Sequence, residues 1–309
     1  MAEVITLTLI FGFIIGFVYF LVWWSYQARA DRAAMVGLYI ILGVPGFLLL
    51  VAGVAVSVRG DISPWGLTLS LTALGLIAPI SRRTREVVAR FGSFDIDDPL
   101  HMTGLGLFLG LVGFWGGQNI LSRAPDVVAE VDVGAIVVQG VFFIALALAC
   151  VGFGIGRGGA QSRIRLGLGP LTLRGVLISL GVVLAGFAVA ILSSVLQMAV
   201  DPDTSEVIDQ NLEAITGGHP TLLMAPLIGL SAGIGEELVI RGVLQPRYGI
   251  VLSSLLFTAL HGQYGFSFVL VGLFGLSLML GWLAKRHGTT HAIVAHTVYN
   301  LVSVLLSAL

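Results

Sequence analysis

The sequence predicts an all-α protein, a polytopic transmembrane helix bundle of about ten spans. Hydrophobic residues make up 57% of the 309 residues, charged residues only 11%, and the mean hydropathy is +1.00. Soluble domains carry about 25% charged residues, so this composition is typical of an integral membrane protein. The 41 glycines and the absence of segments with alternating polarity favour packed helices over a β-barrel.

Ten apolar stretches are candidates for the spans, because a helix needs about 20 apolar residues to cross a membrane. The 249–261 stretch is shorter than the others, and counting it as a span gives an even number of crossings. The candidates cover residues 4–24, 35–58, 64–80, 103–122, 134–156, 173–199, 221–244, 249–261, 265–284 and 289–308.

The distribution of Lys and Arg supports ten spans and predicts their orientation. With the N-terminus and C-terminus outside, fourteen of the sixteen basic residues fall in inner loops, and only Arg59 and Arg123 fall in outer loops. Without the 249–261 crossing, Lys285 and Arg286 would move outside. The 201–220 loop is acidic and has no basic residue, which fits an outer face. Because arginine far outnumbers lysine, as in GC-rich prokaryotes, we expect a prokaryotic plasma membrane.

The charged, glycine-rich stretch 157–170 is the best candidate for a domain boundary. It predicts an N-terminal transmembrane module, 1–160, of unknown role, and a core, 161–309. The core contains the charged residues and histidines that lie within predicted spans. The lipid bilayer is the expected environment, and a net charge of −1 argues against a nucleic-acid partner. Cys150 is the single cysteine, so no internal disulfide is possible, and the sequence does not indicate an oligomeric state.

Two adjacent glutamates, Glu236 and Glu237, lie within the predicted span 221–244. A carboxylate in hydrocarbon is costly unless it is paired or reaches water, so such a residue marks a candidate functional site. Glu237 and Arg241 are four residues apart, share a helix face and can pair. Glu236 points about 100° away and lacks such a partner, which suggests a water-filled cavity. The plainer alternative is a buried Glu–Arg pair with a spare acid at the cytoplasmic edge.

Further polar residues occur in the next spans. His261 follows Phe257 by four residues, while His296 and Asn300 lie four residues apart on one face of the last span. Each alone is typical of a hydrogen-bonded residue between helices. Together with Glu236 they match the needs of peptide hydrolysis: a carboxylate and a histidine can activate water, and a His–Asn pair can stabilise an oxyanion.

The depths of these residues agree only in part. Glu236 lies roughly 9 Å from the inner end of its predicted helix, and His296 lies roughly 10 Å from the inner end of the last one. His261 would lie near roughly 20 Å if its helix began at Tyr248. The short helix must therefore tilt strongly, begin later or be re-entrant.

At these residues the chain resembles the CPBP family of intramembrane proteases, which includes type II CAAX prenyl proteases and bacteriocin self-immunity proteins. The motifs of that family are Glu-Glu-x-x-x-Arg, Phe-x-x-x-His and His-x-x-x-Asn. They stand here in the same order at residues 236–241, 257–261 and 296–300. The resemblance covers about residues 161–309, and the first 160 residues carry no recognised motif.

The resemblance implies a glutamate-dependent intramembrane endopeptidase without a catalytic metal. By its motifs, Glu236 activates the water with His261 as partner, His296 and Asn300 bind the oxyanion, and Glu237 and Arg241 support them. The residues by themselves leave zinc possible, because two histidines and a glutamate can ligate it. His291 lies about 140° around the helix from His296 and is left off the site.

The expected function is therefore hydrolysis of a peptide bond in a membrane-associated peptide or protein, within the C-terminal helices. A proton-coupled transporter is one alternative, since Glu and His relays within helices also move protons. A non-catalytic membrane scaffold or immunity protein is another. The sequence does not identify the substrate or show whether it is prenylated.

Overall fold

The computed structural model describes residues 2–58, 64–121, 132–216 and 221–307, and within these ranges it is helical and contains no strand. This confirms the all-α prediction. By length and composition, eight helical segments of the described chain can cross a membrane, or nine if one bent pair counts as a span. A polytopic bundle is thereby confirmed. Arg59 and Arg123, assigned to outer loops, lie outside the described residues, as do residues 122 and 308 of two predicted spans.

Each predicted span corresponds to a helix. These are α1 (Ala2–Gln27), α2 (Arg32–Val58), α3 (Pro64–Ile77) with the short η1 (Ala78–Ile80), α5 (Pro99–Leu121), α6 (Val133–Cys150), α8 (Leu173–Val200), α10 (Thr221–Glu237), α11 (Gln245–Ala259), α12 (Phe268–His287) and α13 (Thr289–Leu306).

The count of eight treats Leu222–Ala259 as one segment of 38 residues. A straight helix of that length would measure about 57 Å, nearly twice the hydrocarbon thickness of a bilayer. The chain instead bends at Gly249, where φ is 81° and ψ is 172°, so the segment has one arm before Gly249 and a shorter arm after it. The shorter arm, which ends at Ala259, would measure about 15 Å, less than the hydrocarbon thickness of a bilayer. A tenth crossing by this arm therefore stays a prediction.

Three features differ from the prediction: the end of one span, two short helices in basic loops and a helix in the acidic loop. The predicted span 134–156 ends early, at Cys150, because Gly152 and Gly154 take positive φ values of 75° and 78° and turn the chain. Short helices α4 (Arg82–Val88) and α7 (Gly159–Arg165) occupy the basic loops. The acidic loop is largely a helix, α9 (Pro202–Thr216), capped by Asp201, whose carboxylate accepts from the backbone N–H and the hydroxyl of Thr204.

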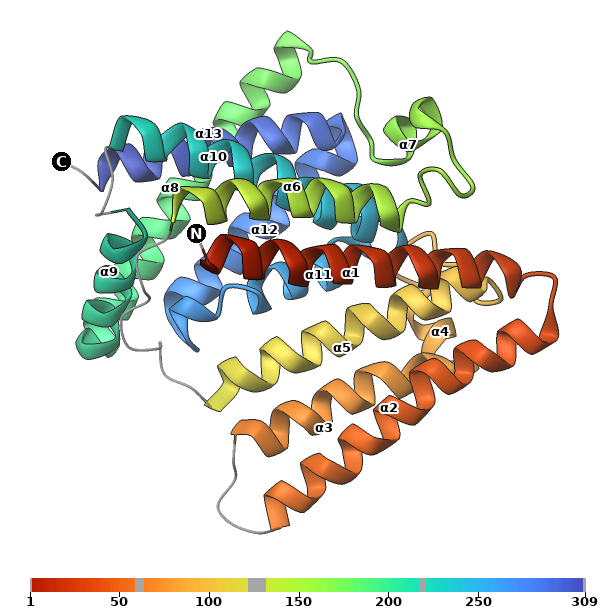
Figure 1. Ribbon diagram of the computed structural model, residues 1–309. Helices are drawn as coiled ribbons and strands as arrows, with labels where there is room; N and C mark the ends of the chain where they lie inside the picture. The colour runs from red at the N-terminus through yellow and green to blue at the C-terminus, as the bar shows by residue number, and fades with distance from the viewer. Residues whose placement is uncertain (1, 59–63, 122–131, 217–220, 308–309) are drawn as a thin grey trace.

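The long helices form two groups, with α2, α3 and α5 on one side and α8, α10, α12 and α13 on the other (Figure 1). Helices α6 and α11 lie between them: α6 packs on α1 and α10, and α11 packs on α5 and α12. The first turn of α1 and the last turn of α13 lie at the same end of the bundle (Figure 1). The N-terminal helices therefore contact the helices that carry the predicted site, and the division near residue 160 stays a prediction.

Helices α10 and α13 approach closely at Gly233. A Cβ atom there would lie 2.8 Å from the backbone nitrogen of Thr297, the residue after His296. Small residues at such positions allow helices to pack backbone against backbone in membranes. Gly233 therefore helps to set the distance between Glu236 on α10 and His296 on α13.

We expect Gly233→Ala to push α13 away from α10 and to destabilise the protein by about 1–3 kcal/mol, as overpacking does. Gly181→Ala on α8 is the matched control, because a Cβ at Gly181 meets no atom within 4 Å. The free energy of unfolding in mixed micelles measures both changes. Equal, small effects would show that the approach at Gly233 tolerates a methyl group.

Candidate active site

The two glutamates lie where α10 changes its helical geometry. Residues Leu238–Leu244 form a π-helical segment, η2, directly after Glu237. Such segments widen a helix locally and are frequent at functional sites. Arg165 of α7 donates hydrogen bonds to the carbonyl oxygens of Gly242 and Val243, at 2.6 and 3.1 Å. Arg165 therefore holds the end of η2 in place, a contact that the sequence did not indicate.

Glu237 is the centre of a buried network. Its carboxylate is 0% exposed and accepts hydrogen bonds from Arg241 Nε at 3.1 Å and from His296 Nδ1 at 3.0 Å. The Arg241 Nη2 atom donates to the hydroxyl of Ser277 on α12, at 2.9 Å. Charge-assisted hydrogen bonds of this kind are stronger than neutral ones, and they offset part of the cost of burying the charges. The predicted Glu237–Arg241 pair is present, and it ties three helices together.

The contact to Glu237 orients His296. A carboxylate oxygen accepts, so the Nδ1 atom of His296 carries a proton and Nε2 faces the other side of the ring. The ring is buried, and the charges of Glu236 and Arg241 both act on it. Sequence reasoning assigned Glu237 to Arg241 alone, and the structure adds His296 as its second partner.

Glu236 has a different environment. Its Oε2 atom is buried and makes no hydrogen bond to any residue that the structure describes. A buried carboxylate oxygen without a partner is costly, and buried polar groups are rarely left so. This oxygen is therefore available to accept a hydrogen bond from a bound molecule, and the charge of Glu236 acts on the imidazole of His296.

His261 lies after the end of α11, just before the short 3-10 turn η3 (Gly262–Tyr264). Its Nδ1 atom lies 2.8 Å from the carbonyl oxygen of Phe257, which only accepts, so Nδ1 carries a proton, and Nε2 makes no hydrogen bond to the described residues. The ring is held between Phe257, with centroids 4.7 Å apart, and Tyr264, stacked at 6.2 Å. Phe257 also contacts His296, at 5.8 Å between centroids. Both histidines therefore border the same phenylalanine.

The kink at Gly249 changes the depth expected for His261, measured from the inner end of its helix. Because helical geometry resumes only after Gly249, the arm that leads to His261 is short, which is the later start among the three alternatives. On the other arm, the first turn of α11 continues the helix beyond Leu244 as far as the kink, so Glu236 lies deeper than its predicted depth. The two corrections bring the predicted depths of Glu236 and His261 closer together.

Tyr264 is a site neighbour that sequence reasoning missed. Burial, followed by the charges of Tyr299 and Glu236, raises the pKa of Tyr264 to about 12, although a hydrogen bond with Gln263 acts in the opposite direction. The phenol is therefore neutral at physiological pH and able to donate. The sequence signal was its position three residues after His261, within a segment that looked like a loop.

Asn300 and His291 lie apart from this network. Asn300 follows His296 by one turn of α13 and makes no hydrogen bond within the described chain. The spacing of one helical turn from His296 is the only feature that links the Asn300 side chain to the site. His291 bonds through Nδ1 to the carbonyl of His287 and accepts from the backbone N–H of Thr172, so it joins α13 to the start of α8. It was left off the site, and its contacts are structural ones.

Whether the protein could bind a metal ion depends on how its possible ligand side chains are arranged. Across the described ranges, no group of three His, Cys, Asp or Glu side chains is arranged to hold one. The bond from His261 Nδ1 to a backbone carbonyl does not decide the question, because it leaves Nε2 open. Hydrolysis without a metal stays a prediction.

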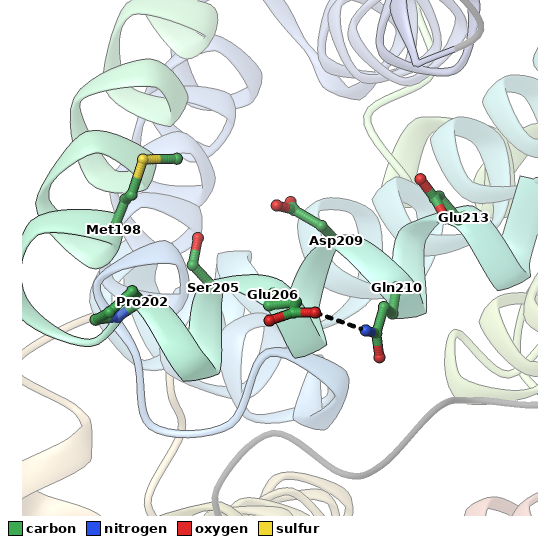
Figure 2. Close-up of a pocket in the computed structure, with 7 residues that line it drawn as sticks. All are labelled: Met198, Pro202, Ser205, Glu206, Asp209, Gln210 and Glu213. Atoms are coloured by element: carbon green, nitrogen blue, oxygen red, sulfur yellow. Dashed lines mark hydrogen bonds between the residues drawn. The ribbon is translucent and has the colours of Figure 1, made fainter.

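A surface pocket of about 330 Å³ lies elsewhere, between the end of α8 and α9 (Figure 2). Met198 lines it from α8, and polar side chains line it from α9. Burial, followed by the charge of Glu213, raises the pKa of Asp209 there. The pocket contains none of the residues predicted to act in catalysis.

Comparison with known proteins places the C-terminal part of the chain. Residues 218–302 match the family described as Type II CAAX prenyl endopeptidase Rce1-like, which confirms the resemblance seen in the three motifs. The chain is also 27% identical over 128 residues to the UPF0177 protein YxdF of Lactococcus lactis subsp. lactis, covering 40% of this chain and 71% of that protein. No solved structure matches the chain.

Proposed function

We propose that this chain, whose residues 218–302 carry the Rce1-like endopeptidase match, is an intramembrane endopeptidase that cleaves a membrane-associated peptide or protein. The observation that carries the proposal is the buried Oε2 atom of Glu236, which makes no hydrogen bond within the described chain, together with His296, which Glu237 holds in place and on which the charge of Glu236 acts. A free carboxylate in a largely apolar bundle is the general base that hydrolysis by water requires.

In this mechanism Glu236 accepts a proton from a water molecule as the water oxygen bonds to the carbonyl carbon of the substrate. The free Nε2 of His261 accepts a hydrogen bond from the same water and orients it. The proton on Glu236 then passes to the leaving nitrogen as the carbon–nitrogen bond breaks. The products are a carboxylic acid and an amine, so atoms and protons balance without a covalent enzyme intermediate.

The developing oxyanion is assigned to His296 and Asn300. His296 donates from Nε2 when it is protonated, and its hydrogen bond to the Glu237 carboxylate favours that state. Because Glu237 and Arg241 balance each other, a protonated His296 also balances the charge of Glu236. The amide of Asn300 makes no hydrogen bond to the described residues, so its N–H groups are available as the second donor.

Tyr264 is proposed to position His261 through ring stacking. We expect Tyr264→Phe, which keeps the ring, to retain most of the activity, and Tyr264→Ala to lower kcat by about tenfold or more, as loss of orientation does. Steady-state kinetics measures both variants. Equal loss in the two variants would instead assign the effect to the phenol hydroxyl.

The arginine-rich end of the bundle is proposed to face the cytoplasm, with both chain termini on the opposite side of a prokaryotic plasma membrane. The site would then be reached from the membrane or the cytoplasmic side. The family description makes a prenylated CAAX-type peptide the first substrate to test, beside unmodified membrane-anchored peptides.

A proton-coupled transporter is the second candidate. The Oε2 atom of Glu236, which makes no hydrogen bond within the described chain, favours it, because acidic side chains within helices also serve as proton carriers. Nothing in the described contacts specifically favours a non-catalytic scaffold.

Purified full-length protein in liposomes separates these candidates. Membrane-anchored peptides, chosen from those that accumulate in a strain lacking the protein, are incubated in ¹⁸O-water and analysed by mass spectrometry. An endopeptidase places one ¹⁸O atom in each new carboxyl group. Proton flux along a pH gradient without cleavage would favour transport, and neither activity on the accumulated peptides would favour a scaffold.

A further inference from the structure

Three arginines from separate segments meet at the arginine-rich end of the bundle. Arg157 lies in the turn after α6, Arg165 ends α7, and Arg247 lies just before the kink at Gly249. All three side chains are half-buried. Burial, followed by the charges of Arg247 and Arg157, lowers the pKa of Arg165 to about 10, so the three charges repel one another. We call these three residues the arginine cluster.

Neutral acceptors hold the cluster in place. Arg157 Nη1 donates to the carbonyl of Val151 at 2.5 Å and to the Tyr26 hydroxyl at 3.4 Å, and Arg247 Nη1 donates to the carbonyl of Ser93 at 3.3 Å. Arg165 bonds the two carbonyls of η2 described above. Within the described ranges, the Nε and Nη2 atoms of Arg157 and Arg247 make no hydrogen bond. The guanidinium groups are therefore fixed at one edge and free at another.

No carboxylate of the described chain lies within 4.0 Å of the cluster. Asp98 is the acid that acts on Arg247, and it is already bonded to Arg29 at 2.8 Å and lies 3.8 Å from His101. Three positive charges are thus brought together without an equal negative charge. Such an arrangement is unfavourable unless an anion joins it.

The cluster lies where the apolar helices end. Its acceptors belong to the last turn of α1, the turn after α6, the segment after α4 and the end of η2, all at one end of the bundle. Phospholipid phosphates lie at this level of a bilayer, and basic pockets between transmembrane helices bind anionic headgroups. The planar guanidinium group also matches a phosphate with two parallel hydrogen bonds.

We propose that Arg157, Arg165 and Arg247 form a binding site for the phosphate of an anionic phospholipid. The headgroup phosphate bridges Arg157, which follows α6, and Arg247, which lies in the first turn of α11, before the kink at Gly249. Because Arg165 also holds η2, which contains Arg241, the lipid supports the same helix that carries the two glutamates.

Thermal unfolding of the full-length protein in detergent tests the site. We expect phosphatidylglycerol to raise the Tm, because a ligand that binds the folded state stabilises it. Phosphatidylcholine with the same acyl chains, and inorganic phosphate at the same concentration, should give no comparable rise. An equal rise with phosphatidylcholine would overturn the proposal, and an equal rise with inorganic phosphate would overturn the lipid as its source.

The variant Arg157→Gln/Arg247→Gln leaves Arg165 and its contacts to η2 intact. We expect it to need at least about tenfold more phosphatidylglycerol for the same rise in Tm, a loss of about 1.4 kcal/mol. Arg83→Gln/Arg90→Gln is the matched control, since it removes two exposed arginines in and just after α4. The same loss in the control would show a general surface-charge effect and overturn the site.

If the glutamine variant does not fold, the variant Arg157→Lys/Arg247→Lys tests the proposed site instead. It keeps both charges but loses the planar group, so we expect several-fold weaker binding of phosphatidylglycerol. An unchanged response would overturn the bidentate contact to phosphate.

Discussion

Glu236→Gln is expected to lower kcat by about 10²–10⁴-fold, the range that general acid–base catalysis contributes. Glutamine keeps the size of the side chain but cannot accept the proton of the attacking water. Because Oε2 of Glu236 makes no hydrogen bond to the described residues, we expect the exchange to leave the hydrogen bonds of the fold intact. Steady-state cleavage of an identified peptide measures the loss, and thermal unfolding in detergent checks that the variant is folded.

Glu206→Gln is the matched control, because it makes the same exchange on the exposed α9, at the side chain that accepts from Gln210 at 3.3 Å. It should leave kcat unchanged. A folded Glu236→Gln variant that cleaves as fast as the wild type would remove Glu236 from the role of base. Glu237, which accepts hydrogen bonds from both Arg241 and His296, could not replace it without breaking that network.

The sequence predicted the helical class and the local pair on one helix, because both depend on spacing along the chain. Hydropathy marks a span within a few residues, and Glu237 and Arg241 share a face wherever their segment is helical. The second partner of Glu237 could not be predicted in this way. His296 is 59 positions away, and its contact depends on the approach of α13 to α10 at Gly233.

One local feature was missed for a different reason. The search for spans looks for long apolar runs, so the acidic 201–220 segment was read as a loop, although Thr204, Ile208 and Asn211 form a buried stripe on α9. The break near Gly249 was predicted, because the spans 221–244 and 249–261 were divided there, but its exact position was not, since a glycine is compatible with either a helix or a turn. Only the depth mismatch of His261 indicated that the short helix was unusual.

The second large effect concerns the buried ion pair. We expect Arg241→Met to destabilise the protein by about 3–5 kcal/mol, because it leaves the fully buried carboxylate of Glu237 without its cation. It also removes the hydrogen bond to Ser277 that joins η2 to α12. The free energy of unfolding in mixed micelles measures the change.

The chain provides a matched control in a second pair with the same spacing. Arg82 Nε and Glu86 Oε1 also lie 3.1 Å apart four residues along a helix, but their side chains are 59% and 49% exposed. Arg82→Met should therefore cost no more than about 1 kcal/mol, since water and ions screen an exposed pair. If Arg241→Met costs no more than Arg82→Met, the buried pair does not stabilise the fold.

The double variant Glu237→Gln/Arg241→Met removes both charges and should recover part of the stability. Its activity should stay low, because His296 then lacks the carboxylate that holds it in the donor state.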